Sequence, residues 1–209
     1  MSKRLLPLFP LQVVVFPRTN LPLHIFEERY KKMVSEALRD NSEFGIVLAK
    51  DEGIVNAGCT VHVEKLLEMY ADGRMDILTR GRQRFEIESL DDEMEFLRAS
   101  VNFFDDEDLE TAAPELRAEA LAQFRVLRDL GSTESRGEAD LEDPQLSFQL
   151  AQNLPDLDFL SGLLRQRSEP GRLKELNRYL AKYIPRQKIV QRVKSLAPNN
   201  GYGGKHLGI

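Results

Sequence analysis

Four prolines interrupt an apolar segment near the N-terminus and limit what this chain can fold into. The segment covers residues 5–30, LLPLFPLQVVVFPRTNLPLHIFEERY, and contains Pro7, Pro10, Pro17 and Pro22. Each proline fixes φ at about −65° and has no backbone N–H, so a long central strand is excluded. The prolines instead divide the segment into short extended pieces. This pattern predicts a kinked ribbon that supplies the first strand at the edge of a small barrel and then bends into a helix.

The rest of the N-terminal half has the pattern of strands around a single helix. Apolar residues recur at helical spacing through residues 26–40, with charged residues on the opposite face, which predicts one amphipathic helix. Asp72 and Gly73 lie between two apolar runs, and Asp-Gly favours the positive φ angles of a tight hairpin turn. Gly81 is expected to interrupt the strand that follows. Strands are predicted at residues 43–50, 59–70, 74–79, 84–90 and 96–104.

The C-terminal half has helical periodicity instead. Pro114 suits the first turn of a helix, and Gly131 ends the pattern that follows it. Pro185 removes an intrahelical hydrogen bond, so a kink or break is expected there. Strands followed by helices, without βαβ alternation, indicate an α+β fold. Helices are predicted at residues 114–130, 144–154, 155–167 and 171–196.

The change from strands to helices sets the expected domain boundaries. The acidic stretch at residues 105–110 separates the two patterns. We therefore expect a β-barrel unit over residues 1–110, which includes the helix at 26–40, and a helical unit over residues 111–196. The last residues, 197–209, are rich in glycine and asparagine and are expected to form a flexible tail.

Composition narrows the class of partner and the compartment. The net charge of −5 and the sequence pI near 5.4 disfavour nucleic acid and anionic membranes as main partners. The single cysteine, Cys59, excludes an intrachain disulfide, so nothing indicates an oxidising compartment. No uninterrupted apolar run approaches the roughly 20 residues that span a bilayer. Together these features predict a cytoplasmic protein with no membrane partner.

Residues that carry catalysis are scarce. His24 precedes the predicted helix and His62 lies within a predicted strand, and neither has a histidine four residues away. Structural or surface roles are therefore favoured over metal binding for both. Cys59 lies in an apolar strand and is interpreted as a small core residue. The chain contains no G-x-S-x-G or S-x-x-K motif.

A nucleotide-binding loop is excluded by spacing. The G-x-x-x-x-G-K-[ST] pattern has one approximate match, which contains Gly204 and Lys205. Asn199 stands in place of its first glycine and His206 in place of its hydroxyl residue, so the match fails at two positions. We therefore predict no catalytic residue, no metal site, no cofactor and no enzyme activity for this chain.

The tip of the predicted hairpin carries the best candidate for a binding surface. Met69, Tyr70 and Met75 flank the Asp72-Gly73 turn. Alternation places Tyr70 and Met75 on one face and Met69 on the other, so apolar side chains occur on both faces. Flexible methionine and amphipathic tyrosine suit contact with apolar peptides. The alternative interpretation is that these side chains pack against the chain's own helices.

Charge is unevenly distributed between two stretches. Residues 86–110 contain eleven acidic residues and one basic residue, whereas residues 171–196 contain eight basic residues and one acidic residue. One interpretation is a basic helix face that binds an acidic partner. The favoured one is a solvated surface, with the two stretches attracting each other within the fold. Aromatic residues are not interleaved with the basic ones, which weakens a nucleic-acid interpretation.

Two blocks of sequence resemble a known family. Residues 6–34, LPLFPLQVVVFPRTNLPLHIFEERYKKMV, resemble the start of the Lon N-terminal domain, the substrate-recognition domain of ATP-dependent Lon proteases. Residues 57–87 are similar to the same domain in their strand, their Asp-Gly-Arg hairpin, the glycine that follows and an Arg-Phe pair. Residues 146–180 resemble its helical part more diffusely.

The resemblance implies a PUA-like small β-barrel, of about six strands plus one helix, followed by a helical bundle. In Lon proteases this module binds protein substrates. The chain ends where those proteases continue into ATPase and Ser-Lys protease domains, which implies a stand-alone, non-catalytic and ATP-independent binding module. Its expected partners are unfolded or apolar protein segments, or a specific protein partner. The alternatives are a hydrolase whose groups converge only in three dimensions, and RNA binding through the PUA-like barrel.

Overall fold

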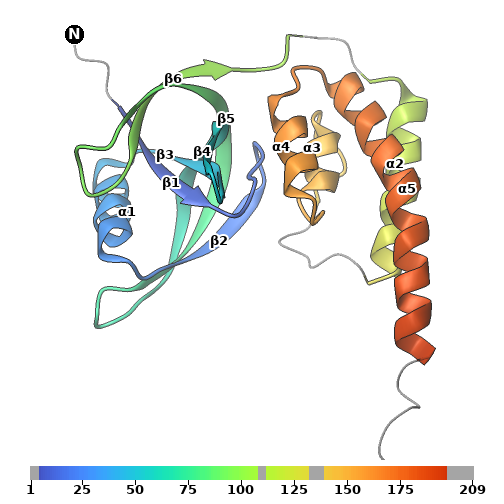
Figure 1. Ribbon diagram of the computed structural model, residues 1–209, viewed down its shortest axis with the longest axis horizontal. Coiled ribbons are helices and arrows are strands. Elements are labelled where there is room, and N and C mark those ends of the chain that lie inside the picture. Colours follow the sequence, from blue (N-terminus) through green and yellow to red (C-terminus); the bar gives the residue numbers. More distant parts are fainter. Residues whose placement is uncertain (1–4, 108–111, 132–138, 197–209) are drawn as a thin grey trace, which may run out of the picture.

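The computed structural model describes residues 5–107, 112–131 and 139–196. Figure 1 shows a strand-rich unit that contains one helix, beside a unit made of helices. The α+β fold predicted from the sequence is confirmed. The elements of the first unit are β1 (Leu6–Leu11), β2 (Asn20–Ile25), α1 (Glu28–Asp40), β3 (Phe44–Lys50), β4 (Gly53–Met69), β5 (Met75–Asp91) and β6 (Arg98–Phe104).

Five of these strands close into a barrel. β1 pairs in parallel with β3 and antiparallel with β6, while β3–β4, β4–β5 and β5–β6 pair antiparallel. These pairings return to the starting strand, so β1, β3, β4, β5 and β6 form a closed ring. β2 is added outside the ring, against the first part of β5. Six strands and one helix match the small barrel that the family resemblance implied.

β5 continues without a break through Gly81, so the interruption predicted at this glycine is wrong. Residues 75–80 of β5 pair with β2, and residues 84–91 pair with β6. Gly81 lies between the two pairings, where a Cβ atom would stand 2.0 Å from the carbonyl oxygen of Phe16. The close approach of another backbone segment therefore requires glycine here, and no turn is involved.

The proline-rich segment forms two strands with a buried crossing between them. β1 pairs with β6 at Leu6 and Pro7 and with β3 at residues 8–11, so each neighbour contacts only part of the strand. Residues 13–16 follow with all four side chains buried, and β2 then leads into α1. The kinked ribbon is confirmed, and β1 is the first barrel strand as expected. The segment also supplies β2, which the sequence pattern did not separate from it.

α1 begins at Glu28, two residues later than predicted. The backbone at Glu27 is still extended, with φ −75° and ψ 136°. Phe26 therefore precedes the helix, and its side chain is 59% exposed. The buried face of the helix follows the predicted spacing and consists of Tyr30, Met33, Val34 and Ala37.

The helical unit contains α2 (Pro114–Asp129), α3 (Leu146–Ala151), α4 (Leu157–Arg165) and α5 (Glu169–Leu196). α5 includes Pro185 without an interruption, so a break does not occur at this proline, and the alternative of a kink stays a prediction. Proline leaves the carbonyl group four residues earlier, that of Ala181, without its helical donor. Pro185 and Ala181 are both exposed, so water can bond this carbonyl group and the helix continues.

One core extends from the barrel into the helices. Phe16 stacks on Phe148 of α3 with ring centroids 4.7 Å apart, and buried apolar residues of both units join a single cluster. The domain boundary near residue 110 stays a prediction, and the predicted tail at residues 197–209 lies outside the described residues. Within the described part of the chain, no helix combines the length and apolar character that crossing a membrane requires.

Candidate functional site

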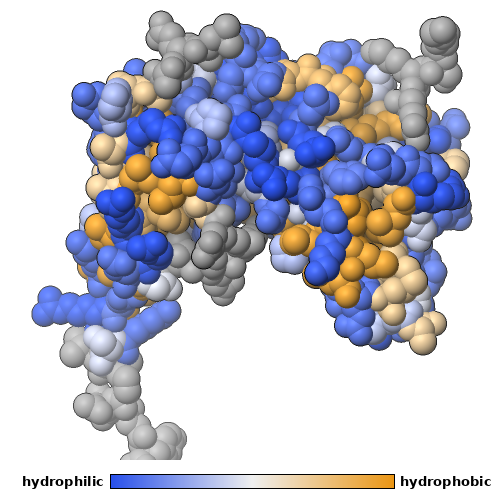
Figure 2. All heavy atoms as spheres, turned by 180° about the vertical axis from the view of Figure 1, so that it is seen from behind, coloured by the Kyte–Doolittle hydropathy of each residue, from blue (hydrophilic) through white to orange (hydrophobic). Residues whose placement is uncertain are grey.

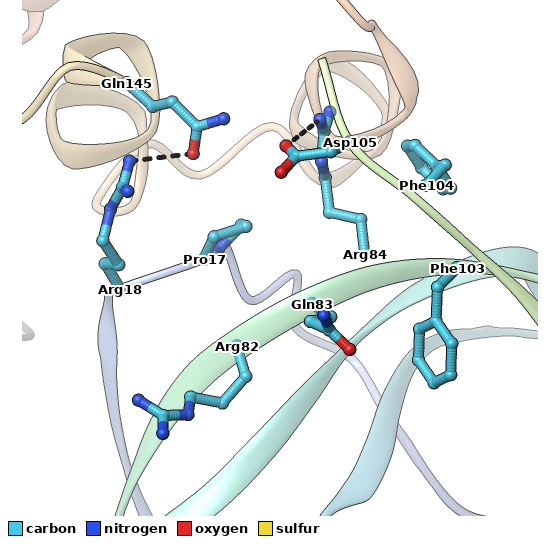
Figure 3. Close-up of a pocket in the computed structure, with 9 residues that line it drawn as sticks. All are labelled: Pro17, Arg18, Arg82, Gln83, Arg84, Phe103, Phe104, Asp105 and Gln145. Carbon is cyan, nitrogen blue, oxygen red and sulfur yellow. Dashed lines mark hydrogen bonds and ion pairs between the residues drawn. The ribbon is translucent and has the colours of Figure 1, made fainter. Parts of the chain in front are cut away.

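A cleft of about 350 Å³ lies where the barrel meets the helical unit (Figure 3). Three arginines line it, but their charges already have partners. Arg18 donates to Asp143 at 2.6 Å and to Gln145 at 2.9 Å. Arg82 is exposed and lies 3.7 Å from a carboxylate oxygen of Glu43. The third arginine, Arg84, belongs to a buried network below.

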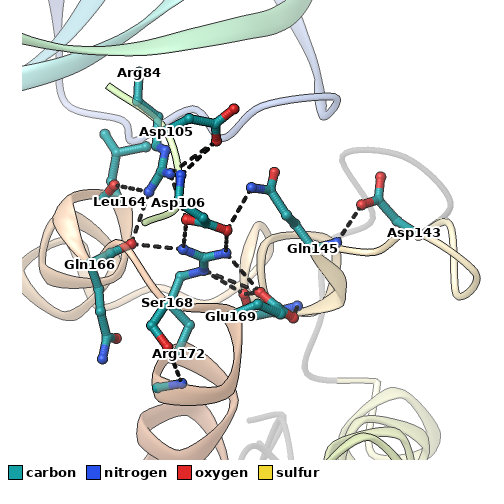
Figure 4. A network of polar contacts seen from close by, with 12 residues as sticks. Arg84, Asp105, Asp106, Asp143, Gln145, Leu164, Gln166, Ser168, Glu169 and Arg172 are labelled. Atoms are coloured by element: carbon teal, nitrogen blue, oxygen red, sulfur yellow. Dashed lines mark hydrogen bonds and ion pairs between the residues drawn. The ribbon is translucent and has the colours of Figure 1, made fainter. Parts of the chain in front are cut away.

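Arg84 of β5 and Arg172 of α5 meet at Asp106, which follows β6 (Figure 4). Their side chains are 1% and 0% exposed. Asp106 accepts a hydrogen bond of 2.6 Å from Nη2 of Arg84. It also accepts two bonds of 2.6 Å from Nη1 and Nη2 of Arg172, which in turn binds Glu169 at 2.9 Å. The network therefore ties the barrel to the helical unit.

Burial affects the two carboxylates of this network differently. Burial disfavours the charged form of Asp106, but hydrogen bonds from Arg172 and Gln145 outweigh it and lower the pKa of Asp106 to about 2. At Glu169, burial dominates over the bonds from Ser147 and Arg172, so its pKa is raised. The contact of Asp106 with Arg172 joins the acidic and basic stretches of the sequence, which confirms attraction within the fold at this point.

The cysteine and the histidines among the described residues have structural or surface positions. Cys59 is fully buried, and burial raises the pKa of its thiol to about 12, which confirms its interpretation as a core residue. His62 is half-buried within β4, and His206 lies outside the described residues. The part of the chain that the structure describes holds no group of three or more His, Cys, Asp and Glu residues placed to bind a metal ion.

The three candidate residues at the hairpin tip do not share one surface. Met69 is 60% exposed and Tyr70 is half-buried, whereas Met75 is 1% exposed and belongs to the core. The last pair of β4 and β5 before the turn is Met69 with Met75. Counting outward from the Asp72-Gly73 turn instead places Tyr70 opposite Met75, which is why simple alternation put these two residues together. Met75 therefore leaves the candidate surface, which keeps Met69 and Tyr70.

Asp76 holds Tyr70 and His24 together at the base of the tip. The Tyr70 hydroxyl donates to Oδ2 of Asp76 at 2.7 Å, and Nδ1 of His24 lies 2.6 Å from Oδ1. The bond with Asp76 raises the pKa of Tyr70 to about 12, and the bond with His24 lowers the pKa of Asp76. Lys31 of α1 donates to the carbonyl oxygen of Asp72 in the turn at 3.0 Å. β2 and α1 thus hold the tip from two directions.

Exposed apolar side chains gather around this tip. The ring of Phe26 stacks 6.0 Å from that of His24, which lies 6.1 Å from the ring of Tyr70. Figure 2 shows apolar surface over the hairpin end of the barrel, at the lower right. Helical spacing alone assigns Phe26 to a buried helix face, which is why the sequence does not identify it as a surface residue. We define the hairpin patch as Phe26, Leu66, Leu67, Met69 and Tyr70.

A second apolar surface lies along β2. A groove of about 330 Å³ separates β2 from the end of β1, and only one of its lining side chains, Gln12, is polar. We call it the β2 groove. Its lining consists of Leu11, Gln12, Val13, Leu21, Pro22 and Leu23.

β2 also has an unpaired backbone edge. Among the described strands it pairs with β5 alone. The amide of Gly81 donates to the carbonyl oxygen of Thr19 at 2.9 Å, and bonding alternates along an antiparallel pair. The odd-numbered residues of β2 therefore bond to β5, and the even-numbered residues direct their backbone groups outward. This outward set is Asn20, Pro22 and His24.

A closed barrel joined to a helical unit defines an α+β domain, with apolar surface beside a strand edge that no described strand pairs with. Comparison with known families identifies the family of this domain. The model of the ATP-dependent protease La (LON) substrate-binding domain matches residues 5–182. The chain belongs to this family, so the resemblance inferred from the sequence blocks is confirmed.

Curated relatives and solved structures agree with this assignment. Lon protease 2 of Syntrophobacter fumaroxidans is 23% identical over 207 residues, which cover 91% of this chain and 26% of the relative. Lon protease of Parabacteroides distasonis is 26% identical over 110 residues, which cover 48% of this chain and 13% of the relative. The chain thus spans about a quarter or less of the length of these relatives.

Two solved structures share the fold. The Lon N-terminal domain protein of Xanthomonas campestris has a TM-score of 0.67 at 26% identity, covering 82% of this chain and 96% of that one. The N-terminal domain of a Mycobacterium avium complex Lon protease has a TM-score of 0.61 at 14% identity, covering 85% of this chain and 98% of that one. The second likeness shows the fold alone.

Proposed function

We propose that this chain recognises apolar segments of unfolded proteins, which bind in extended form along the free edge of β2. The observation that carries the proposal is the setting of this strand. Its unpaired edge adjoins the β2 groove, and its end adjoins the hairpin patch through His24. Membership of a substrate-binding family supports the choice of protein as the ligand.

The bound segment lies beside β2 as an added strand. It exchanges backbone hydrogen bonds with Asn20 and His24, while alternate side chains enter the β2 groove. Pro22 offers a carbonyl group but no N–H, so it interrupts the ladder at its centre. A proline on an exposed edge also hinders uncontrolled pairing with other strands. Recognition therefore depends mainly on apolar side chains and tolerates many sequences.

The expected affinity is low. Burying an apolar side chain contributes about 1.5–3 kcal/mol, and two or three side chains fit along a strand of this length. Ordering a disordered segment opposes binding by about 2–5 kcal/mol, and association itself has a further entropic cost. The balance suits transient capture rather than permanent assembly.

The proposal assigns no catalytic role to this chain. The cleft arginines have protein partners, and the one thiol is buried with a raised pKa. These observations favour a binding module over a hydrolase. We place its action in the cytoplasm, as the composition predicts.

Binding of a permanently unfolded, carboxymethylated protein tests the proposal by fluorescence anisotropy. The variant Leu67→Ser/Met69→Ser removes apolar surface from the hairpin patch, and Leu23→Ser removes it from the β2 groove. Each variant loses the burial of at least one apolar side chain, which contributes about 1.5–3 kcal/mol. Since about 1.4 kcal/mol corresponds to tenfold in affinity, each is expected to weaken binding by about tenfold or more.

The matched control is Val126→Ser/Leu141→Ser, which removes exposed apolar surface from the helical unit. This control is expected to bind like the wild type. Equal binding by all variants, or no binding by the wild type, would refute the proposal. Circular dichroism and denaturant midpoints must show that each variant is folded.

A further inference from the structure

The last turns of α5 form an exposed face that is both apolar and basic. Beyond Ile184, none of the described side chains of α5 is buried. Ile189 and Val193 are 65% and 60% exposed, and their spacing of four residues places them one above the other. Arg186 extends the same stripe, and Arg192 and Lys194 flank it. We call this surface the α5 face.

A groove of opposite charge lies on the barrel. It has a volume of about 910 Å³ and runs between the start of β1, α1 and β6. Phe96 forms part of its buried lining, while Met94 and Phe103 are exposed. Glu36 and Glu43 contribute negative charge. We call this surface the acidic groove.

Of the carboxylates that line the acidic groove, Glu43 lies 3.7 Å from Arg82, whereas Glu36 has no ion pair among the described residues, so the groove keeps a negative charge. Its single lining arginine, Arg98, is bound to Asp91 at 3.1 Å. Asp92 and Glu93 are exposed on the adjoining loop and add to the charge. An apolar surface framed by acidic groups therefore matches an apolar stripe framed by basic groups, both in polarity and in sign.

The last turns of α5 lie on the side of the helical unit away from the barrel, which contains β1, α1 and β6 (Figure 1), so the two surfaces do not meet within one molecule. We propose that the α5 face of one copy docks in the acidic groove of a second copy. The contact buries Ile189 and Val193 against Met94 and Phe103, and it sets Arg186 among the acidic residues. This proposal does not depend on the ligand of the β2 edge.

A contact between two different surfaces is heterologous. Each copy in a pair keeps one unused groove and one unused helix face, so association continues into a ring or an open chain. Charge contributes to the contact, so association is expected to weaken as ionic strength rises. Neither of the two surfaces includes a residue of the hairpin patch.

Two complementary variants of the full chain test the proposal. Arg186→Glu/Ile189→Glu disables the α5 face, and Glu36→Lys/Met94→Lys disables the acidic groove. The control is Lys174→Glu, which reverses an exposed charge on the first turns of α5, outside the α5 face. Sedimentation velocity from micromolar to near-millimolar concentration measures the size of the species.

The wild type and the control are expected to associate with rising concentration, and each disabled variant alone is expected to remain monomeric. Mixing the two disabled variants is the decisive measurement, because each retains the surface that the other lacks. The mixture is expected to form a one-to-one dimer and nothing larger, since no unimpaired surface is left to extend it.

Three outcomes would overturn the proposal. One is a wild type that stays monomeric at every concentration, and another is association that survives in either disabled variant. The third is a mixture that forms no dimer although the wild type associates, which would show that the α5 face and the acidic groove do not bind each other. If vesicles of anionic phospholipid bind the wild type and the groove variant equally but not the α5 variant, the helix face serves a membrane surface instead.

Discussion

Two parts of the protein differ in what they bury and what they expose: the junction between the two units, and the hairpin end of the barrel. The junction buries Arg84 and Arg172 with their carboxylate partners, whereas the hairpin end exposes Phe26 and Met69. Buried charges that are fully hydrogen-bonded permit few alternative arrangements. Exposed apolar side chains leave hydrophobic free energy available for contact with another molecule. The comparison indicates a rigid frame that holds one open surface in place.

Removing Arg172 should destabilise the junction between the two units, and this is the largest effect that we expect. Arg172→Ala leaves the carboxylates of Asp106 and Glu169 buried without their main counter-charge. The expected loss in the free energy of unfolding is about 3–5 kcal/mol, measured by urea denaturation. Arg178→Ala is the control, since its exposed pair with Glu175 should contribute less than about 1 kcal/mol. Similar losses for both variants would contradict the rigid-frame interpretation.

A substitution at Gly81 tests the close approach of β5 to the backbone of Phe16. In Gly81→Ala the new methyl group meets the carbonyl oxygen of Phe16, so backbone must move, and we expect a loss of about 1–3 kcal/mol. Gly162→Ala places a methyl group in α4 with no atom within 4 Å, and a gain of about 0.5–1 kcal/mol is expected there. Thermal or urea unfolding of the two variants should shift in opposite directions, and a shift of the same sign would count against the close approach.

Acid should loosen the junction through Asp106. Its pKa is about 2 in the fold against an ordinary value of 3.8, so the folded state binds the proton more weakly than the unfolded chain does. The resulting stability, about 2 kcal/mol, is present above the ordinary pKa and is lost as pH falls toward 2. The raised pKa of Glu169 acts in the opposite sense, so its contribution increases stability as pH falls toward 4.5.

Urea unfolding across this pH range separates the two contributions. Asp106→Asn should flatten the loss of stability below pH 4, and Glu169→Gln should flatten the loss of stability as pH rises above 4.5. If the free energy of unfolding of Asp106→Asn falls with pH as steeply as that of the wild type, other carboxylates control acid unfolding.

The smallest expected effect belongs to the hairpin end. Tyr70→Phe removes one hydrogen bond to Asp76, which typically contributes about 0.5–1.5 kcal/mol. Because Tyr70 is half-buried at a tip, we expect global stability to change at the low end of that range. Hydrogen exchange should be faster for amides of the tip and unchanged for those of β3. Uniformly faster exchange would mean that the tip is part of the rigid frame.

Local patterns predicted the elements that depend on neighbours in sequence. The helix after the proline-rich segment, the Asp-Gly turn and the helical second half all follow from spacing, turn chemistry and periodicity. Gly73 adopts φ +82°, as this turn requires. These features depend on contacts within a few residues, so they are present in the sequence itself. A small barrel was expected from the proline-interrupted ribbon and the run of short strands, and the family resemblance specified its type.

Features that depend on distant contacts were missed or misplaced. Gly81 looked like a strand end, but its role is set by Phe16 of another segment. Met75 was placed on the same face as Tyr70, but it pairs with Met69 and its side chain belongs to the core. Phe26 looked buried because helical spacing continued past the true start of α1. In each case a tertiary contact or pairing overrides the local pattern.

The sequence by itself determined the order of strands and helices, the helix faces that become buried and, through its family blocks, the fold. Tertiary structure alone decided which charges are buried and which apolar groups are exposed. The partners Asp106 and Arg172 are 66 residues apart, and Phe26 reaches Tyr70 only through His24. Burial and pairing are properties of the folded chain as a whole. A free strand edge beside apolar surface can therefore be recognised only once every other strand has found its neighbour.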